Sequence, residues 1–176
     1  MNSSAATLLH WREREVLDGQ PVLRRLVAKY AKPAGKLHND LLRAFLNQFV
    51  FDDPSIIINP GVGEDTAAVN VETEEVLVLK SDPITFATDS IGQYAVLINA
   101  NDIATSGASP QWLMTTLLFP PGATPSAILA VMTDINEACG QWGITLCGGH
   151  TEITDAVHRP VVVGTLGAAM ERADLI

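Results

Sequence analysis

The sequence predicts one folded domain that combines helices with strands, and three observations support this. The stretch 91–106 is apolar on nearly every side, as expected of a helix buried between layers. The stretch 125–142 carries its apolar residues at helical spacing on one face, which is typical of a helix lying on a core. Short runs rich in valine, leucine and isoleucine indicate strands. These runs are 66–71, 76–81, 111–119, 144–147 and 160–170.

Composition limits the possible functions. The chain has 176 residues, of which 47% are hydrophobic, and its formal net charge is −9. Such a charge argues against sequence-independent binding of nucleic acid, so an anionic ligand would need metal ions and backbone N–H groups. No apolar run reaches membrane-spanning length and the charged start is unlike a signal peptide. We therefore expect a cytoplasmic protein, with Cys139 and Cys147 as buried thiols.

The N-terminal part is predicted to be helical. An apolar stripe within 22–30 precedes a break at 32–35, and we interpret residues 1–34 as a helical extension. A second helix follows and ends at the Asp-Asp-Pro of 52–54. Its apolar face carries Leu41, Leu42, Phe45, Leu46 and Phe49. Both stripes indicate core packing.

The next elements form a turn and a hairpin. Asn59–Asp65 combines two glycines and a proline with Glu64 and Asp65, a pattern that favours a tight backbone path. The two acids could equally belong to a solvated turn. The strands 66–71 and 76–81 flank the acidic segment 72–75, which predicts a β-hairpin.

The stretch 81–110 is the centre of the prediction. A strand is expected to end at Ser81-Asp82-Pro83, and a polar loop then leads into the helix 91–106, which Gly107 closes. Asn99 and Asp102 share a face of this helix, and a carboxylate there is costly unless it is paired. Either these side chains bond a neighbouring loop, or Asp82 and Asp102 converge on a cation. The residues alone leave both readings open.

The last third contains one well-marked helix and a glycine-rich segment. Thr124 can cap the helix, Pro125 fits its first turn, and Gly143 ends it. The strand 144–147 then runs into Gly148-Gly149-His150-Thr151-Glu152. The glycines would let backbone N–H groups approach an anion, although an ordinary turn with a histidine fits as well. The strand 160–170 is apolar enough to be covered on both faces.

Four motifs together resemble a known family. In order they are GVGEDTAAV, SDPITF, DSIGQYAVLINANDIATSGASP and ITLCGGHTEIT. Roughly over residues 35–172 the chain resembles the N-terminal ATP-binding domain of the aminoimidazole ribonucleotide synthetase superfamily. That superfamily also contains selenophosphate synthetase, thiamine-monophosphate kinase and the hydrogenase-maturation carbamoyl dehydratase, and the last branch is the most similar. Each motif is weak by itself, and the set is specific.

The resemblance implies an architecture. The fold would be α+β, with a four-stranded mixed sheet that has helices on one face. Sheets of two subunits would pair into a barrel-like dimer core, which predicts a homodimer through the sheet face. Residues 35–176 would be the ATP-binding domain of a longer two-domain protein, inactive without the glycine-rich C-terminal domain of the family.

The resemblance also implies a chemistry, in which Mg²⁺ and ATP serve to phosphorylate an amide or carboxamide oxygen of a small-molecule or protein acceptor. The carboxylates that would hold Mg²⁺ are Asp65, Asp82 and Asp102. The residues that would meet the nucleotide are Asn101, Gly148, Gly149, His150 and Thr151. No catalytic residue is predicted. A kinase of the thiamine-monophosphate type and a non-catalytic nucleotide-sensing dimerisation module stay open as alternatives.

Two positions depart from the family pattern. Glu64 stands where many relatives have the first Asp of a pair, and His150 stands where the kinase and dehydratase branches have Asp. The first changes the reach of a carboxylate by one methylene. The second removes a possible metal ligand.

Overall fold

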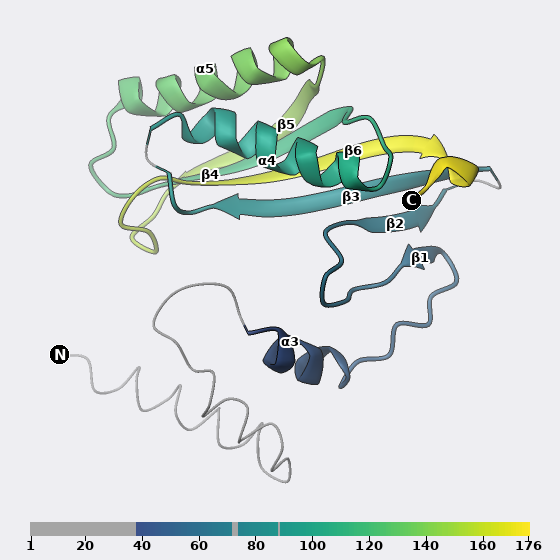
Figure 1. Ribbon diagram of the computed structural model, residues 1–176. Coiled ribbons are helices and arrows are strands. Elements are labelled where there is room, and N and C mark those ends of the chain that lie inside the picture. The colour runs from purple at the N-terminus through teal and green to yellow at the C-terminus, as the bar shows by residue number, and fades with distance from the viewer. Residues whose placement is uncertain (1–37, 72–73, 88) are drawn as a thin grey trace, which may run out of the picture. The chain divides into compact units, whose positions relative to one another are not determined.

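The structure is a computed structural model, and it describes residues 38–71, 74–87 and 89–176. The chain divides into two compact units, Met1–Phe51 with Pro60–Gly63, and Asp52–Asn59 with Glu64–Ile176. The helical extension predicted for 1–34 lies outside the described residues. Of the first unit the structure describes one helix, and the second unit holds the sheet (Figure 1).

The helix of the first unit is α3, Asn39–Leu46. The side chain of His38 accepts a hydrogen bond from the Asp40 N–H, and Asn47 follows the last turn. After it, backbone bonds link residues three apart instead of four, which tightens and ends a helix. The expectation that this helix continues to the Asp-Asp-Pro segment was therefore wrong, and Phe49 lies beyond it, exposed.

The second unit is built on a mixed sheet of six strands in the order β1-β2-β3-β6-β4-β5. All neighbours are antiparallel except β4 and β5, which are parallel. The strands are β1 Ile56–Ile58, β2 Ala67–Asn70, β3 Glu75–Ile84, β4 Trp112–Phe119, β5 Thr145–Ile153 and β6 Val161–Glu171, and a short 3₁₀ turn η1, Arg172–Asp174, follows β6. The α+β class is confirmed. The sheet has six strands where four were expected, because β1 and β5 extend its two edges.

The helices of this unit, α4 (Ile91–Thr105) and α5 (Pro125–Trp142), lie on the same face of the sheet (Figure 1). Alternate strand residues point toward them and are buried, which is the pattern of a sheet with one covered face. The largest side chains of this core include Phe119, Ile84, Ile91, Ile103, Leu113, Ile135 and Leu166. The prediction of helices on one face is confirmed within the second unit.

Helix α4 is less enclosed than its sequence suggests. Ile91, Val96 and Ile103 are buried against the sheet and α5, but Tyr94 and Leu97 are 41% and 38% exposed. The expectation of a helix buried on every side was therefore wrong for the part of the chain that the structure describes. One sheet and one neighbouring helix cover only part of a helix surface.

Helix α5 agrees with its sequence signals. The Thr124 hydroxyl accepts a hydrogen bond from the Ala127 N–H at 3.2 Å, and Pro125 occupies the first turn. Gly143 closes the helix in the left-handed region at φ 66°. Among the helices of the described residues, none is long and apolar enough to cross a membrane.

Strand β3 is longer than expected. It continues through Ser81, Asp82 and Pro83 to Ile84, where a strand end was predicted. Pro83 is tolerated because β2 pairs with β3 only as far as Leu79, so the proline meets a partner strand on one side alone.

Strand β5 also corrects the prediction. Gly148–Glu152 was expected to be a loop, yet these residues belong to the strand, which pairs with β4 as far as Ile153. Cys147 sits at an irregularity of this pairing and is exposed, contrary to the expectation of two buried thiols. Cys139 is buried as expected, and burial raises the pKa of its thiol.

Candidate functional site

Asp82 and Asp102 meet at the junction of β3 and α4, and a lysine lies between them. The Lys80 Nζ is 2.7 Å from Asp102 Oδ2 and 3.9 Å from Asp82 Oδ2. Lys80 and Asp82 are two residues apart on one strand, so both side chains point to the helix-covered face. The two carboxylates thus lie beside a lysine ammonium group, which neither of the two readings left open by the sequence included.

This charge cluster is partly shielded from water. The exposed fractions of the side chains are 13% for Lys80, 32% for Asp82 and 24% for Asp102. A lysine is rarely taken that far from solvent unless it is paired, and screening by salt is weaker for a partly buried pair than for a surface pair. The arrangement therefore ties α4 to β3 through charge as well as through apolar packing.

The three acids expected to hold Mg²⁺ do not form one group. Asp65 is exposed in the segment that precedes β2. Across the described ranges 38–71, 74–87 and 89–176, no three His, Cys, Asp or Glu residues are gathered so that they could hold a metal ion. As they stand, these residues do not fit a magnesium ion shared by Asp65, Asp82 and Asp102, because Lys80 already neutralises Asp102.

A buried amide lies beside this cluster. Asn99 is fully buried in α4, and its Nδ2 donates to the Ala95 carbonyl at 2.8 Å. Its Oδ1 is buried without a hydrogen-bond partner among the described residues. The amide rests on Gly164 of β6, where a Cβ would collide with it. Asn101, which was predicted to meet the nucleotide, is exposed on the same helix.

The second feature is a pocket of about 290 Å³ between α5 and the strands β4 and β5. It contains all four residues of the glycine-rich segment that were predicted to meet a nucleotide. Its lining is Thr115, Leu117, Met132, Ile135, Leu146, Gly148, Gly149, His150 and Thr151. The volume is near the lower limit of roughly 300 Å³ for ligand pockets, so it suits one ring system with its substituents.

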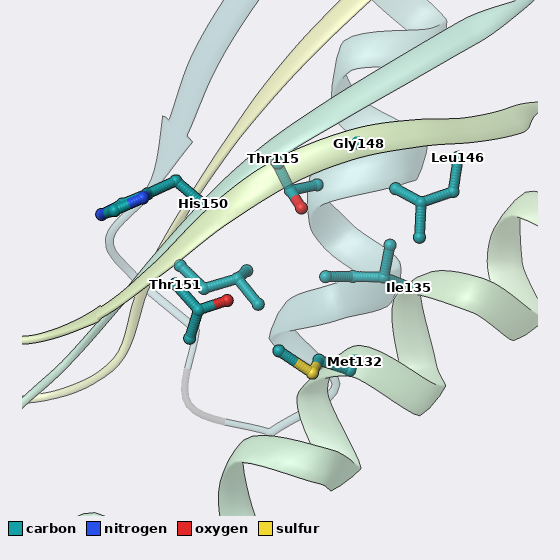
Figure 2. Close-up of a pocket in the computed structure, with 9 residues that line it drawn as sticks. Thr115, Met132, Ile135, Leu146, Gly148, His150 and Thr151 are labelled. Carbon is teal, nitrogen blue, oxygen red and sulfur yellow. The ribbon is translucent and has the colours of Figure 1, made fainter.

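Side-chain directions divide these residues into two groups. Figure 2 shows the Thr115 and Thr151 side chains pointing into the space between the strands and α5, whereas the His150 ring points away from it. The His150 Nε2 is instead 3.5 Å from Glu152 Oε2, and both side chains are exposed. The pocket thus has apolar walls and the hydroxyl groups of Thr115 and Thr151, and His150 lines it only with its backbone.

Gly149 is required where it stands. A Cβ at this position would collide with the backbone carbonyl oxygen of Thr115 on β4. The absence of a side chain therefore lets β5 lie against β4 along the pocket wall.

One row of the sheet connects the charge cluster with the pocket. The strand register places Asp82 opposite Gly164, Gly164 opposite Thr115, and Thr115 opposite Gly149. The row spans four strands, or about 14 Å, and Asn99 covers its middle. It is polar or small throughout, in a sheet face that is otherwise mostly apolar.

Sequence reasoning missed Lys80, Asn99 and Thr115 as members of this site. A signal was present for the first, because a lysine two residues before Asp82 in an apolar strand must face the same side. Asn99 was singled out only for sharing a face with Asp102. Thr115 gave no signal, since a threonine in a strand is ordinary.

The fold and the site define this protein as an α+β domain with a polar row under its helices. Comparison with known proteins identifies the family. Residues 63–169, more than half of the chain, match the family described as AIR synthase related protein, N-terminal domain. The chain belongs to this family, and the resemblance inferred from the motifs is confirmed.

Two curated relatives and one solved structure illustrate the similarity. A hydrogenase expression/formation protein of Methanocaldococcus jannaschii is 27% identical over 118 residues, covering 62% of this chain and 35% of that protein. Carbamoyl dehydratase HypE of Escherichia coli is 29% identical over 107 residues, covering 54% and 32%. PurL of Thermotoga maritima, solved with ATP, has a TM-score of 0.63 at 17% identity, covering 78% of this chain and 25% of PurL, and supports the fold. The chain spans about a third of the length of these curated relatives.

Proposed function

We propose that this chain is the Mg-ATP-binding domain of an ATP-dependent enzyme that activates an amide or carboxamide oxygen by phosphorylation. Two curated relatives carry hydrogenase-formation or carbamoyl-dehydratase names, which favours the hydrogenase-maturation branch. In such a step the amide oxygen attacks the γ-phosphorus of ATP, the bond to the β–γ bridging oxygen breaks, and ADP leaves. The C–O bond of the phosphorylated amide can then break and release phosphate, either with loss of the remaining N–H proton to form a nitrile or with attack of a nucleophile on the carbon.

One observation carries the proposal. The pocket beside β5 gathers the four residues of the glycine-rich segment that the family resemblance assigns to the nucleotide. Its apolar walls suit a flat ring, and the Thr115 and Thr151 hydroxyls can bond ring substituents. Gly148 and Gly149 leave the backbone of β5 open to close approach by a ligand.

The second part of the proposal concerns the polar row. We place the nucleotide ring at the pocket end of the row, so that Asp82 and Asp102 at its other end face the charged end of the nucleotide or the acceptor. In this proposal Mg²⁺ is the counter-ion of the phosphates. An acidic protein of net charge −9 needs such a counter-ion to approach a triphosphate.

The test is a substitution that fills the pocket. Thr151→Phe in the whole protein that carries this chain should weaken binding of Mg-ATP, measured by calorimetry, by about tenfold or more, because the ring occupies ligand space. Thr151 is exposed, so the fold should tolerate the change. Thr145→Phe is the matched control, since Thr145 is also an exposed residue of β5 and does not line the pocket. Equal affinities of the two variants would refute the pocket as the nucleotide site.

The acceptor is tested separately. A carboxamide-bearing acceptor should stimulate ADP release by the whole protein, and a hydroxyl- or phosphate-bearing acceptor should not. The reverse result would assign the chain to the kinase alternative.

A further inference from the structure

Lys80 is the one cation that the structure places against Asp82 and Asp102 within its described residues. It precedes Asp82 by two positions in β3, so its side chain lies on the same face of the strand and its ammonium group reaches Asp102 of α4. Its neighbours on the same strand face, Val76 and Val78, are fully buried. A lysine in that row is unusual, and its place is explained by the two acids above it.

The geometry leaves little room for a second cation. Asp102 Oδ2 accepts from Lys80 Nζ at 2.7 Å, the length of a charge-assisted hydrogen bond. A divalent ion coordinates a carboxylate oxygen at about 2.0–2.6 Å. An ion bound to the same oxygen would therefore lie within about 5 Å of a positive charge, where like charges repel strongly.

We propose that Lys80 is the built-in counter-cation of the Asp82–Asp102 pair, and that a divalent ion binds this pair only when the ammonium leaves. In the absence of metal, the Lys80 ammonium group then fills the position that a divalent ion would take. Lys80 holds α4 on β3 while no metal is bound. When a metal ion displaces it, the Lys80 side chain moves away and its ammonium group stays next to the site. This role goes beyond the proposed function and does not depend on ATP binding.

The experiment titrates the chain with Mn²⁺ alone, without nucleotide, and follows free Mn²⁺ by electron paramagnetic resonance. Lys80→Met keeps an unbranched side chain that is one atom shorter and removes the charge. We expect it to bind Mn²⁺ with a Kd lower than that of the unmodified chain by about tenfold or more, because two carboxylates are left without a cation. Mn²⁺ should also raise the Tm of this variant and leave that of the unmodified chain nearly constant.

Two control variants separate this pair from other acids on the surface. Lys80→Arg keeps the positive charge and should bind Mn²⁺ no better than the unmodified chain. Lys80→Met combined with Asp102→Asn should lose the gained binding, because one of the two ligands is gone. A Lys80→Met variant that gains no Mn²⁺ binding would overturn the proposal.

A second test uses the unmodified chain, so it does not depend on whether the Lys80 variants fold. If it binds Mn²⁺ tightly and Asp102→Asn abolishes that binding, the ammonium does not occupy the cation position and the proposal fails. If Mn²⁺ binding is weak and Asp102→Asn leaves it unchanged, the pair is closed to metal as proposed. Neither outcome bears on the pocket, whose test uses Mg-ATP and Thr151→Phe.

Discussion

At the scale of single residues, Gly164 marks the closest approach of α4 to the sheet. A Cβ there would lie 3.0 Å from the Ala95 carbonyl oxygen and would collide with the Asn99 amide. Both contacts are rigid, because one is helix backbone and the other belongs to a short, fully buried side chain. The polar row between the charge cluster and the pocket therefore depends on the missing side chain of Gly164, as it does on that of Gly149.

Gly164→Ala should accordingly destabilise the protein by about 1–3 kcal/mol, the usual cost of overpacking a core. The free energy of unfolding is measured by urea titration. Gly148→Ala is the control, since nothing lies within 4 Å of a Cβ at that position, and it should be neutral or slightly stabilising. Equal losses in the two variants would show that the contact at Gly164 relaxes freely.

At the scale of elements, α5 is the part whose sequence and structure agree most closely. Val131, Ile135 and Cys139 face the core at helical spacing, and both ends carry the capping residues that the sequence predicts. The helix also forms one wall of the pocket through Met132 and Ile135. Its first turn is therefore a place where local helix stability can be tested apart from the site.

Thr124→Ala should lower the free energy of unfolding by about 1 kcal/mol, because the Ala127 N–H loses its acceptor. Thermal unfolding followed by circular dichroism measures the change. Thr133→Ala, at an exposed position within the same helix, should cost nothing, since alanine is the better helix former there. A loss at Thr133 as large as that at Thr124 would contradict the capping argument.

At the scale of the whole molecule, the face of the sheet opposite α4 and α5 carries an exposed apolar patch. Leu77, Leu79 and Trp112 come together around Gly167 on that face, and Trp112 and Met114 are 43% and 53% exposed. Contiguous apolar surface of this kind marks an interaction site. We propose that a second copy of the chain covers it, as the family resemblance implies.

Sedimentation velocity at micromolar concentration should therefore show a dimer. Met114→Glu should shift it to monomer, because a buried unpaired carboxylate opposes association. Leu129→Glu is the matched control, since Leu129 is 63% exposed on α5, and it should stay dimeric. A monomeric unmodified chain that is fully folded would refute the dimer.

The elements with a strong local pattern were predictable from sequence. The helix 91–105 follows from a long apolar run closed by Gly107, and the helix 125–142 follows from hydrophobic spacing and end signals. These signals act between residues close in the chain. The four motifs sufficed to name the family, and the glycine-rich segment that the resemblance assigns to a nucleotide lines a pocket. The ends of strands were less predictable, because β5 continues past Cys147 only through its pairing with β4.

The α+β class, the two helices that cover the sheet and the family all follow from the amino-acid sequence. What the acids face depends on packing, since Lys80 and Asp102 belong to different elements and meet only when α4 packs on β3. The same holds for the row from Asp82 to Gly149, whose members come from four strands in an order unlike that of the chain. Local patterns fix elements because neighbouring residues share a periodic backbone. Partners across a sheet are fixed by register and layer packing, which no single stretch of sequence contains.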